Sequence, residues 1–214
     1  MKNCILILMS ALWLSGCGPE VLTWDEEVLL NTGETIIVHR EATYTLSGSG
    51  DNPFKMSMHP RRWDMAIYFD YHGKRYRYAG DAVLFLLAIS PQGNPNLIIY
   101  PEGFSWDTGN NFNPCAVPYY GQLTPDTTGE VWSFPENIDP WLYGLRGNLS
   151  RDISYEKIKN TRLVTHDEIG LYYARESLRP ETKRFSFVDP EHKGRRCGRG
   201  LSVKVSPRDF GLRK

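Results

Sequence analysis

Residues that could do chemistry are spread thinly along this chain of 214 residues. No His-Glu-x-x-His motif and no paired-cysteine spacing occurs, so the sequence predicts no metal site, and we expect no cofactor. A Gly-x-Ser-x-Gly elbow, a phosphate-binding loop and a dinucleotide fingerprint are also missing from the sequence, which argues against common hydrolase and nucleotide chemistry. The five histidines lie far apart, and each is interpreted as a strand or turn residue: His39, His59, His72, His166 and His192.

One tripeptide, Asp107-Thr108-Gly109, has the residues with which aspartic proteases present a catalytic carboxylate. Those enzymes use two carboxylates that share a proton, so this chain would have to dimerise to supply the second. Asn110 stands where those enzymes have a small residue, and Asp-Thr-Gly is also a good turn sequence. We favour the turn. The alternative function is a hydrolase that acts on glycan or peptide with carboxylates such as Asp107 and Glu130.

Aromatic residues are dense between residues 100 and 143, where prolines and glycines are interleaved with them. Regular structure is therefore expected to be sparse there. Trp106, Trp132 and Trp141 could stack on sugar rings or anchor a protein partner. Hydrogen bonds from ligand hydroxyls could be accepted by Asp107, Glu130, Glu136 and Asp139. The same rings could instead cover an open face of the core. The sequence favours this packing role, because aromatic residues in a loop-rich segment usually have to be buried.

The N-terminus has the arrangement of a secretory signal, with Lys2 followed by an apolar run over residues 5–14 and small residues at 15 and 16. This run is too short to anchor the chain, since a helix needs about 20 apolar residues to span a bilayer. Leu14-Ser15-Gly16-Cys17 resembles the lipobox of bacterial lipoproteins. The alternative is an ordinary signal peptide with a chance cysteine.

The lipobox resemblance implies cleavage before Cys17, which would then carry a diacylglyceryl thioether and an amide-linked acyl chain such as palmitate. The membrane would be a partner through this lipid, since several buried acyl chains hold a protein firmly. Position 18 is glycine rather than aspartate, which in that family favours the outer membrane, facing the periplasm.

Export would leave two cysteines for the folded part of the chain. Cys4 leaves with the signal and Cys17 carries the lipid, so Cys115 and Cys197 remain. Because an exported protein meets an oxidising compartment, we expect a disulfide between them. The alternative is a free thiol at Cys197 whose pKa the neighbouring arginines lower.

Charge is balanced overall, with 25 basic and 25 acidic residues, but it is placed unevenly. Residues 17–34 carry acids and no Lys or Arg, whereas residues 192–214 are strongly basic. The basic strip could contact anionic headgroups or glycan phosphates. It could also be a solvated tail or a partner for the acidic segment, and we favour that interpretation. Nucleic acid is not expected as a partner, because no recognition module is visible.

The hydrophobic pattern predicts a mainly β fold, an antiparallel meander or sandwich-like core with one or two short helices and the loop-rich aromatic segment. A hairpin is expected over residues 24–46, with a turn at residues 31–34 and its apolar positions at Val28, Leu30, Ile36 and Val38. Further strands are expected at residues 63–71, 75–78, 82–89 and 97–100. Residues 24–100 would then form one meander in which 82–89 is a central strand and 47–62 is a loop.

The segment from Trp24 to Glu41 also resembles the start of an uncharacterised group of proteobacterial lipoproteins, which brings no known activity. Later in the chain, Ser154 is expected to cap a helix over residues 154–160. Residues 165–168 have capping-box spacing, but residues 169–173 fit either a helix or a strand. Residues 183–188 and 201–205 alternate as strands do.

These observations predict a signal peptide over residues 1–16, a lipidated tether over 17–23, a β-rich domain over 24–190, and a basic strip over 191–214 that packs on the domain or extends from it. The expected function is that of a lipid-anchored envelope protein with a binding or structural role toward an envelope glycan or protein complex. The sequence leaves enzymatic activity open and favours its absence.

Overall fold

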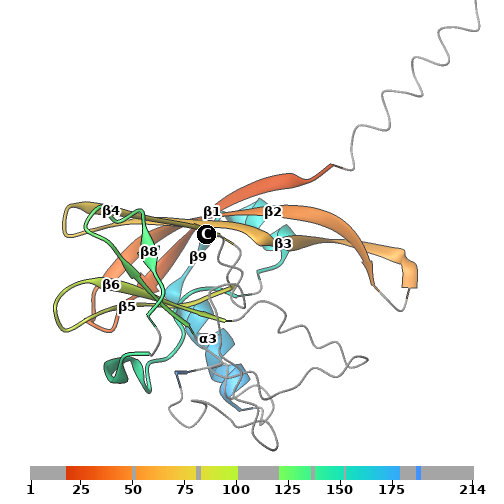
Figure 1. Ribbon diagram of the computed structural model, residues 1–214. Coiled ribbons are helices and arrows are strands. Elements are labelled where there is room, and N and C mark those ends of the chain that lie inside the picture. Colours follow the sequence, from red (N-terminus) through yellow and green to blue (C-terminus); the bar gives the residue numbers. More distant parts are fainter. Residues whose placement is uncertain are drawn as a thin grey trace, which may run out of the picture.

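Two β-sheets form the body of the protein (Figure 1). The computed structural model describes residues 18–49, 52–80, 83–100, 121–135, 138–151, 153–178 and 187–188. The first sheet has the strand order β4-β3-β2-β1-β9, in which β9 runs parallel to β1, and the second has the order β5-β6-β7-β8. The predicted mainly β fold with a sandwich-like core is therefore confirmed. The predicted single meander divides instead into two sheets after β4.

Strands that follow one another in the chain are neighbours in the sheets, from β1 to β4 in the first sheet and from β5 to β8 in the second. The first sheet contains β1 (Glu20–Leu29), β2 (Thr35–Ser49), β3 (Asn52–Tyr71), β4 (Lys74–Gly80) and β9 (Leu163–Val164). The second contains β5 (Val83–Ile89), β6 (Pro95–Tyr100), β7 (Gly121–Pro125) and β8 (Trp132–Ser133).

The hairpin of β1 and β2 forms as predicted. Gly33 takes a φ of 89° in the turn, a conformation that glycine adopts without steric cost. Val28 pairs with Ile36 across the ladder, and Val28, Leu30 and Val38 are buried. The strand begins four residues before the predicted hairpin, at Glu20, so the described part of the predicted tether is mostly strand.

The predicted loop over residues 47–62 is wrong, because β2 and β3 continue through most of it as a long hairpin. Ala42 pairs with Met65 but Tyr44 pairs with Pro60, so β3 has three more residues than β2 in this interval. Such a bulge accommodates proline, which cannot donate to a regular ladder. The His59-Pro60 dipeptide, which contributed to the predicted loop, therefore lies in a strand next to a bulge.

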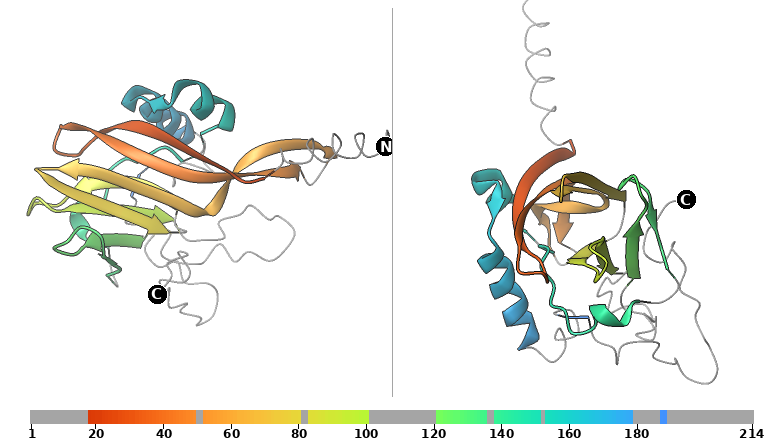
Figure 2. Two further views of the ribbon diagram at one scale, coloured as in Figure 1. Left: turned by 90° about the horizontal axis from the view of Figure 1, so that it is seen from above. Right: turned by 90° about the vertical axis from the view of Figure 1, so that its left-hand side faces the viewer.

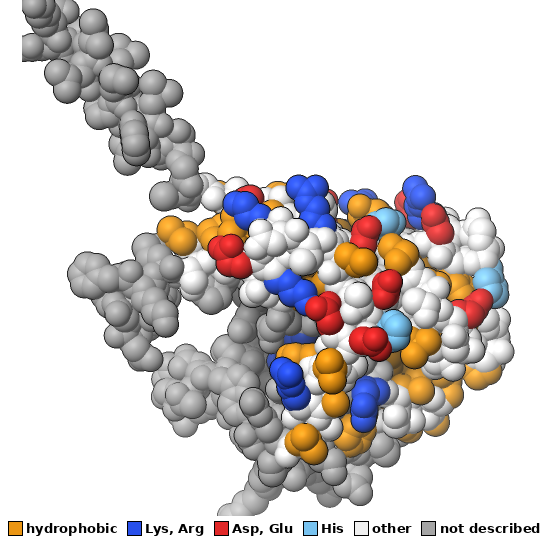
Figure 3. Space-filling view, turned by 180° about the vertical axis from the view of Figure 1, so that it is seen from behind, with side chains coloured by type: hydrophobic (Ala, Val, Ile, Leu, Met, Phe, Trp, Pro, Cys, Tyr) orange, Lys and Arg blue, Asp and Glu red, His pale blue; other side chains and the backbone are white. Residues whose placement is uncertain are grey.

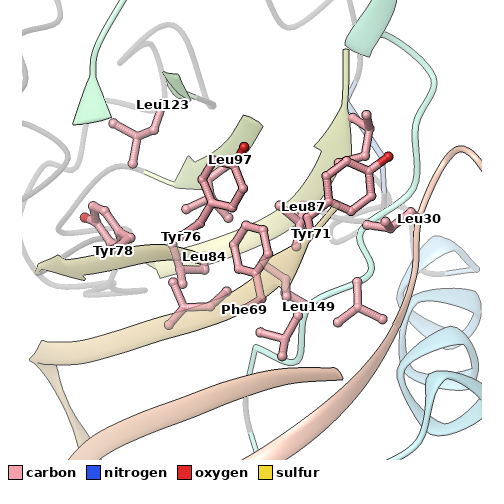
Figure 4. Close-up of a cluster of buried hydrophobic side chains, with 14 of the residues drawn as sticks. Leu30, Phe69, Tyr71, Tyr76, Tyr78, Leu84, Leu87, Leu97, Leu123 and Leu149 are labelled. Carbon is pink, nitrogen blue, oxygen red and sulfur yellow. The ribbon is translucent and has the colours of Figure 1, made fainter. Parts of the chain in front are cut away.

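The hairpin of β3 and β4 agrees with the predicted alternation. Ile67 and Phe69 face inward from β3, and Tyr76 and Tyr78 face inward from β4 between exposed arginines. The connecting turn places Gly73 at a φ of 76°. In Figure 4, Phe69 and Tyr76 from the first sheet meet leucines of the second sheet in the core between them.

Strand β5 is buried along its length but lies at an edge of its sheet, so the predicted central position is wrong. Two side-chain amides take the place of a further strand. The Asn148 amide bonds Leu87 N and Leu87 O at 2.8 Å each, and the Asn31 amide bonds Ile89 N at 2.7 Å and Ile89 O at 2.9 Å. An apolar run alone cannot distinguish this satisfied edge from a central strand.

Two α-helices and one 3-10 turn complete the described fold: η1 (Pro140–Leu142), α2 (Tyr155–Thr161) and α3 (His166–Ser177). Ser154 caps α2 by accepting a hydrogen bond from Lys157 N, as predicted. Thr165 and Glu168 bond reciprocally, with Thr165 N donating to Glu168 Oε2 at 3.1 Å. The capping box therefore begins a helix, not a strand. Both helices lie beside β1 (Figure 2, right).

A second core cluster lies toward the helices. Trp24 and Tyr44 from the first sheet meet Phe85 from β5 and Tyr173 from α3 in it. The Tyr173 hydroxyl donates to Leu149 O at 2.8 Å, and burial raises the pKa of this phenol well above its ordinary value of 10.0. This cluster fixes α3 and the segment around residue 149 against the sheets.

Several predictions lie outside the described residues. They concern the signal segment with Cys17, the disulfide between Cys115 and Cys197, the side chains of Trp106 and Asp107, the strand at 201–205 and the basic strip over 191–214. Of the strand predicted at 183–188, residues 187 and 188 are described, and Phe187 forms an antiparallel bridge with Arg146.

Candidate functional site

Trp132 holds two sheets together. Its indole Nε1 donates to Arg77 O at 2.6 Å, and its ring meets Tyr78 edge-on with centroids 6.1 Å apart. The side chain is half-buried against the core between the sheets. Because its polar atom and one ring edge are engaged with β4, Trp132 has the packing role that the sequence favoured.

Trp141 lies in η1 and packs, half-buried, against the helix-side core cluster. Asp139 precedes it and accepts a hydrogen bond from Gln122 Nε2 at 2.8 Å, while Asp139 N donates to Gln122 Oε1 at 2.9 Å. Trp132 and Trp141 thus pack on different core clusters. Glu130, one of the carboxylates considered for a hydrolase, is exposed in the loop before β8.

A buried ion pair between β1 and β2 was not predicted. The carboxylate of Glu26 is fully buried, and Arg40 is 2% exposed. Arg40 Nη1 donates to Glu26 Oε2 at 3.2 Å, Trp24 Nε1 donates to Oε1 at 2.8 Å, and Arg40 also lies over the Trp24 ring. The sequence contained a signal for this pair. Glu26 and Arg40 lie two residues from Val28 and Val38, and side chains two residues apart on a strand point to the same side.

Ser150 completes the shell around Glu26. Its backbone N donates to Glu26 Oε2 at 3.1 Å, and its hydroxyl donates to Oε1. A carboxylate is stable in a low-dielectric interior only when its acceptor positions are met by donors and its charge is paired. The buried pair therefore fixes the position of Ser150, 124 residues away in sequence.

A cavity of about 280 Å³ lies beyond Ser150, between α2, α3 and residues 150, 151, 153 and 154. We call it the helix-side cavity. Its apolar wall consists of Ile153, Val164, Ile169 and Tyr172. Its polar wall consists of Ser150, Arg151, Ser154, Lys157 and Glu168.

The two helices are joined at this cavity by an ion pair. Lys157 Nζ on α2 lies 2.6 Å from Glu168 Oε1 on α3. The hydrogen bond from Lys157 and a further one from Thr165 N lower the pKa of Glu168 below its ordinary value of 4.5. Glu168 is thus anionic at neutral pH, and the ionised pair keeps the two helix N-terminal turns side by side.

A larger hollow of about 590 Å³ lies on the other side of α3, and Leu29, Asn148 and Leu171 are among its lining residues. His166 stands at this hollow, with Nδ1 3.6 Å from Glu27 Oε2 and Nε2 3.2 Å from Asp167 Oδ1.

The acids of β1 find partners within the described fold. Glu20 accepts from the Tyr155 hydroxyl at 2.5 Å, Asp25 lies 2.5 Å from His39 Nδ1, and Glu27 contacts His166. The acidic segment therefore pairs with β2 and the helices. Its predicted pairing with the basic C-terminal strip lies outside the described residues.

On the outer face of the first sheet, one row of side chains crosses four strands. Asp25 pairs with His39, His39 with Tyr68 and Tyr68 with Arg77. The rings of His39 and Tyr68 stack with centroids 4.9 Å apart. In the view from above, β2, β3 and β4 present this face to the viewer (Figure 2, left). The row is open to solvent, unlike the helix-side cavity.

Compared with protein-family models, curated proteins and solved structures, the chain matches none of them. Within the described residues, no group of three or more His, Cys, Asp or Glu side chains could hold a metal ion, and no helix has the length and apolar character needed to cross a membrane. In the helix-side cavity, polar, charged and apolar side chains of the described residues line one partly open space.

Proposed function

We propose that this chain is a lipid-anchored binding protein of the bacterial cell envelope and that the helix-side cavity is its binding site. The cavity carries the proposal, because ligand sites are typically concave, largely apolar and supplied with a few placed polar groups. Ile153, Ile169 and Tyr172 provide the apolar surface, and Arg151 and Lys157 provide the charge.

The rigid surroundings of the cavity support binding. Ser150 is held by the buried Glu26, and α2 and α3 are capped at Ser154 and Thr165. A wall that is fixed before the ligand arrives reduces the entropy lost on binding. The packing role that the sequence favoured for the aromatic segment is filled by Trp132 and Trp141, each of which packs against a core cluster.

The lipid anchor rests on Leu14-Ser15-Gly16-Cys17. It is tested by labelling cells that express the full chain with an alkyne analogue of palmitate and then fractionating their membranes. We expect label on the wild type and on Cys4→Ser, and none on Cys17→Ser. Equal labelling of Cys17→Ser would contradict the anchor.

Binding is tested on the full-length chain purified from envelope membranes in mild detergent. We expect native mass spectrometry to detect a retained small molecule, and the cavity-filling variant Ile153→Trp to lose it. Val131→Trp is the matched control, since Val131 is 64% exposed and lies away from the cavity. Retention of the same molecule by both variants would exclude the helix-side cavity as its site.

A further inference from the structure

We propose that the projecting end of the β2–β3 hairpin contacts the bilayer surface beside the lipid anchor, with Leu46 at the contact. This end consists of residues 44–49 of β2 and 52–60 of β3, and we call it the β2–β3 arm. The inference rests on the proposed lipid at Cys17 and adds a second, non-covalent contact with the same membrane. That contact is separate from the helix-side cavity.

The ladder places the arm next to the start of β1. Glu20 pairs with Tyr44, and β2 continues past this pair as far as Ser49, toward the side from which the chain enters β1. At about 3.3 Å per residue, residues 45–49 extend about 16 Å beyond the pair. In the view from above, the arm reaches past the second sheet on the side where β1 begins (Figure 2, left).

The lipid would be attached close to this arm. Cys17 stands three residues before Glu20, the first residue of β1. Since an extended chain spans at most about 3.6 Å per residue, an acyl group on Cys17 begins within about 11 Å of the Glu20–Tyr44 pair. The arm extends farther from this pair than Cys17 can. A bilayer that holds the lipid therefore lies within reach of the arm.

The core-facing side of β2 leaves the core at the arm. Tyr44 is 1% exposed in the helix-side core cluster, whereas Leu46, the next residue on the same side of the strand, is 37% exposed. Leu46 pairs with Met58, which is half-buried against that cluster. In the view from behind, apolar side chains reach the surface at the end of the molecule where β1 begins (Figure 3). Contact with a bilayer would remove this apolar surface from water.

The sequence of β3 continues the apolar alternation toward the tip of the arm. Beyond the pair of Leu46 and Met58, Gly48 lies opposite Met56 in the ladder. Met56 and Phe54 occupy the alternate positions of β3 that follow Met58 toward the turn. The arm therefore has the apolar period that an interfacial segment needs, in a part of the hairpin that lies beyond the core.

The charges at this end suit an anionic bilayer. Within residues 44–62, basic residues outnumber acidic ones, with Lys55, Arg61 and Arg62 against Asp51. Basic residues close to a membrane surface are attracted by its anionic lipids. Glu20 would be repelled, but it accepts a hydrogen bond from the Tyr155 hydroxyl and lies 4.0 Å from Lys159 Nζ. The pairing of Glu20 reduces this repulsion.

The arm is joined at its base to the helix-side cavity. The Tyr44 hydroxyl donates to Ile153 O at 3.3 Å, and Ile153 lines the cavity. An arm held at the bilayer would therefore orient the cavity relative to the membrane, which the short tether from the lipid cannot do alone.

The test is photo-crosslinking of the full-length chain reconstituted in vesicles of phosphatidylethanolamine and phosphatidylglycerol. Leu46 is replaced by p-benzoylphenylalanine, and Val131 is replaced in the control. Val131 is 64% exposed and follows Gly129, which approaches Arg75 at the opposite end of the first sheet. Trypsin cleaves after Arg40 and so separates the arm from Cys17 before mass spectrometry. We expect about tenfold more phospholipid adduct at position 46 than at position 131.

A second measurement uses the same probe at position 58, opposite Leu46. Leu46→Ser should lower its phospholipid adduct severalfold, because the substitution removes the apolar contact. Thr45→Ala, on the other side of β2, should leave the adduct within about twofold. Circular dichroism and the urea midpoint of each variant confirm that the arm's loss of contact is not a loss of folding.

Palmitate labelling of the same samples separates this inference from the anchor. Label on Cys17 with equal adducts at positions 46 and 131 would overturn the arm contact and leave the anchor in place. Crosslinking of position 46 to a protein instead of phospholipid, in envelope membranes, would also overturn it. Phospholipid adduct at position 46 without label on Cys17 would overturn the anchor alone, and the absence of both would overturn both.

Discussion

Two ion pairs on the same two strands have opposite surroundings. Asp25 and His39 face solvent with side chains 46% and 44% exposed, whereas Glu26 and Arg40 face the core with side chains 0% and 3% exposed. Each pair joins β1 to β2, and the second is displaced from the first by one residue on each strand. Because side chains alternate along a strand, that single step moves a pair from water to the interior.

The comparison shows that the effect of an ion pair on stability depends on whether the pair is exposed to solvent or buried. An exposed pair gains little, because water and salt screen the charges and the side chains lose freedom. A buried pair has lost its hydration, so each remaining donor matters. Glu26 has donors from Arg40, Trp24 and Ser150, whereas Asp25 has His39 and solvent.

Removing the buried carboxylate should have the largest effect. Glu26→Gln leaves the Arg40 charge buried without a counter-charge, and loss of one partner from such a pair costs about 3–5 kcal/mol. Urea unfolding followed by tryptophan fluorescence measures this as a lower midpoint. The neighbouring change Glu27→Gln is the control and should cost less than about 1 kcal/mol, because Glu27 is half-buried and its pair with His166 is partly exposed. Equal effects of the two changes would refute the comparison.

Removing one donor to Glu26 should have an intermediate effect. Ser150→Ala deletes the hydroxyl but keeps the donation from Ser150 N. A hydrogen bond to a charged group contributes about 1.5–3 kcal/mol, so we expect a loss in that range in the same unfolding assay. Ser133→Ala removes an exposed hydroxyl and should lie near zero. A loss as small as that of Ser133→Ala would mean that the shell around Glu26 tolerates a missing donor.

The exposed pair should contribute much less. Asp25→Asn is expected to change the free energy of unfolding by less than about 1 kcal/mol, and 0.5 M salt should reduce the difference further because salt screens exposed charges. The difference caused by Glu26→Gln should persist in the same salt. If Asp25→Asn instead lowers the free energy of unfolding by several kcal/mol independently of salt, the pair of Asp25 and His39 contributes as a buried pair does.

The smallest effect concerns the partly exposed pair of Lys157 and Glu168, whose side chains are 33% and 44% exposed. The pKa of Glu168 is lower in the folded chain than its ordinary value of 4.5, mainly because Lys157 donates to it. The stabilisation is therefore complete above that value and is lost as the pH falls through the lowered pKa. Melting curves from pH 6 to pH 3 should show a slightly shallower decline for Glu168→Gln than for the wild type. Parallel declines would show that Glu168 does not contribute to the loss of stability at low pH.

Alternation and turn chemistry predicted the β1–β2 and β3–β4 hairpins, because their inward positions and turn glycines lie within a few residues of one another. The same local signals failed over residues 47–62, where Pro60 pairs with Tyr44 next to a bulge of a long hairpin. Composition does not distinguish a loop from a bulged strand. Residues 83–89 were correctly predicted as strand, but their place in the sheet depends on the distant Asn148.

The candidate site was only partly within reach of the sequence. Glu26 and Arg40 occupy inward-facing positions of the predicted hairpin. A charged residue at a position where the strand pattern calls for an apolar residue is a signal that can be searched for. Ser150 carries no such signal, since its contact with Glu26 spans 124 residues. The helix-side cavity likewise depends on how α2 and α3 pack, which local periodicity does not specify.

The amides of Asn31 and Asn148 have a consequence for self-association. The backbone groups of Leu87 and Ile89 that point away from β6 would otherwise form an open template for a strand of another molecule. The two asparagines occupy these groups without adding a strand. They therefore hinder edge-to-edge aggregation at high local concentration. We expect substitution of either asparagine to reduce solubility first.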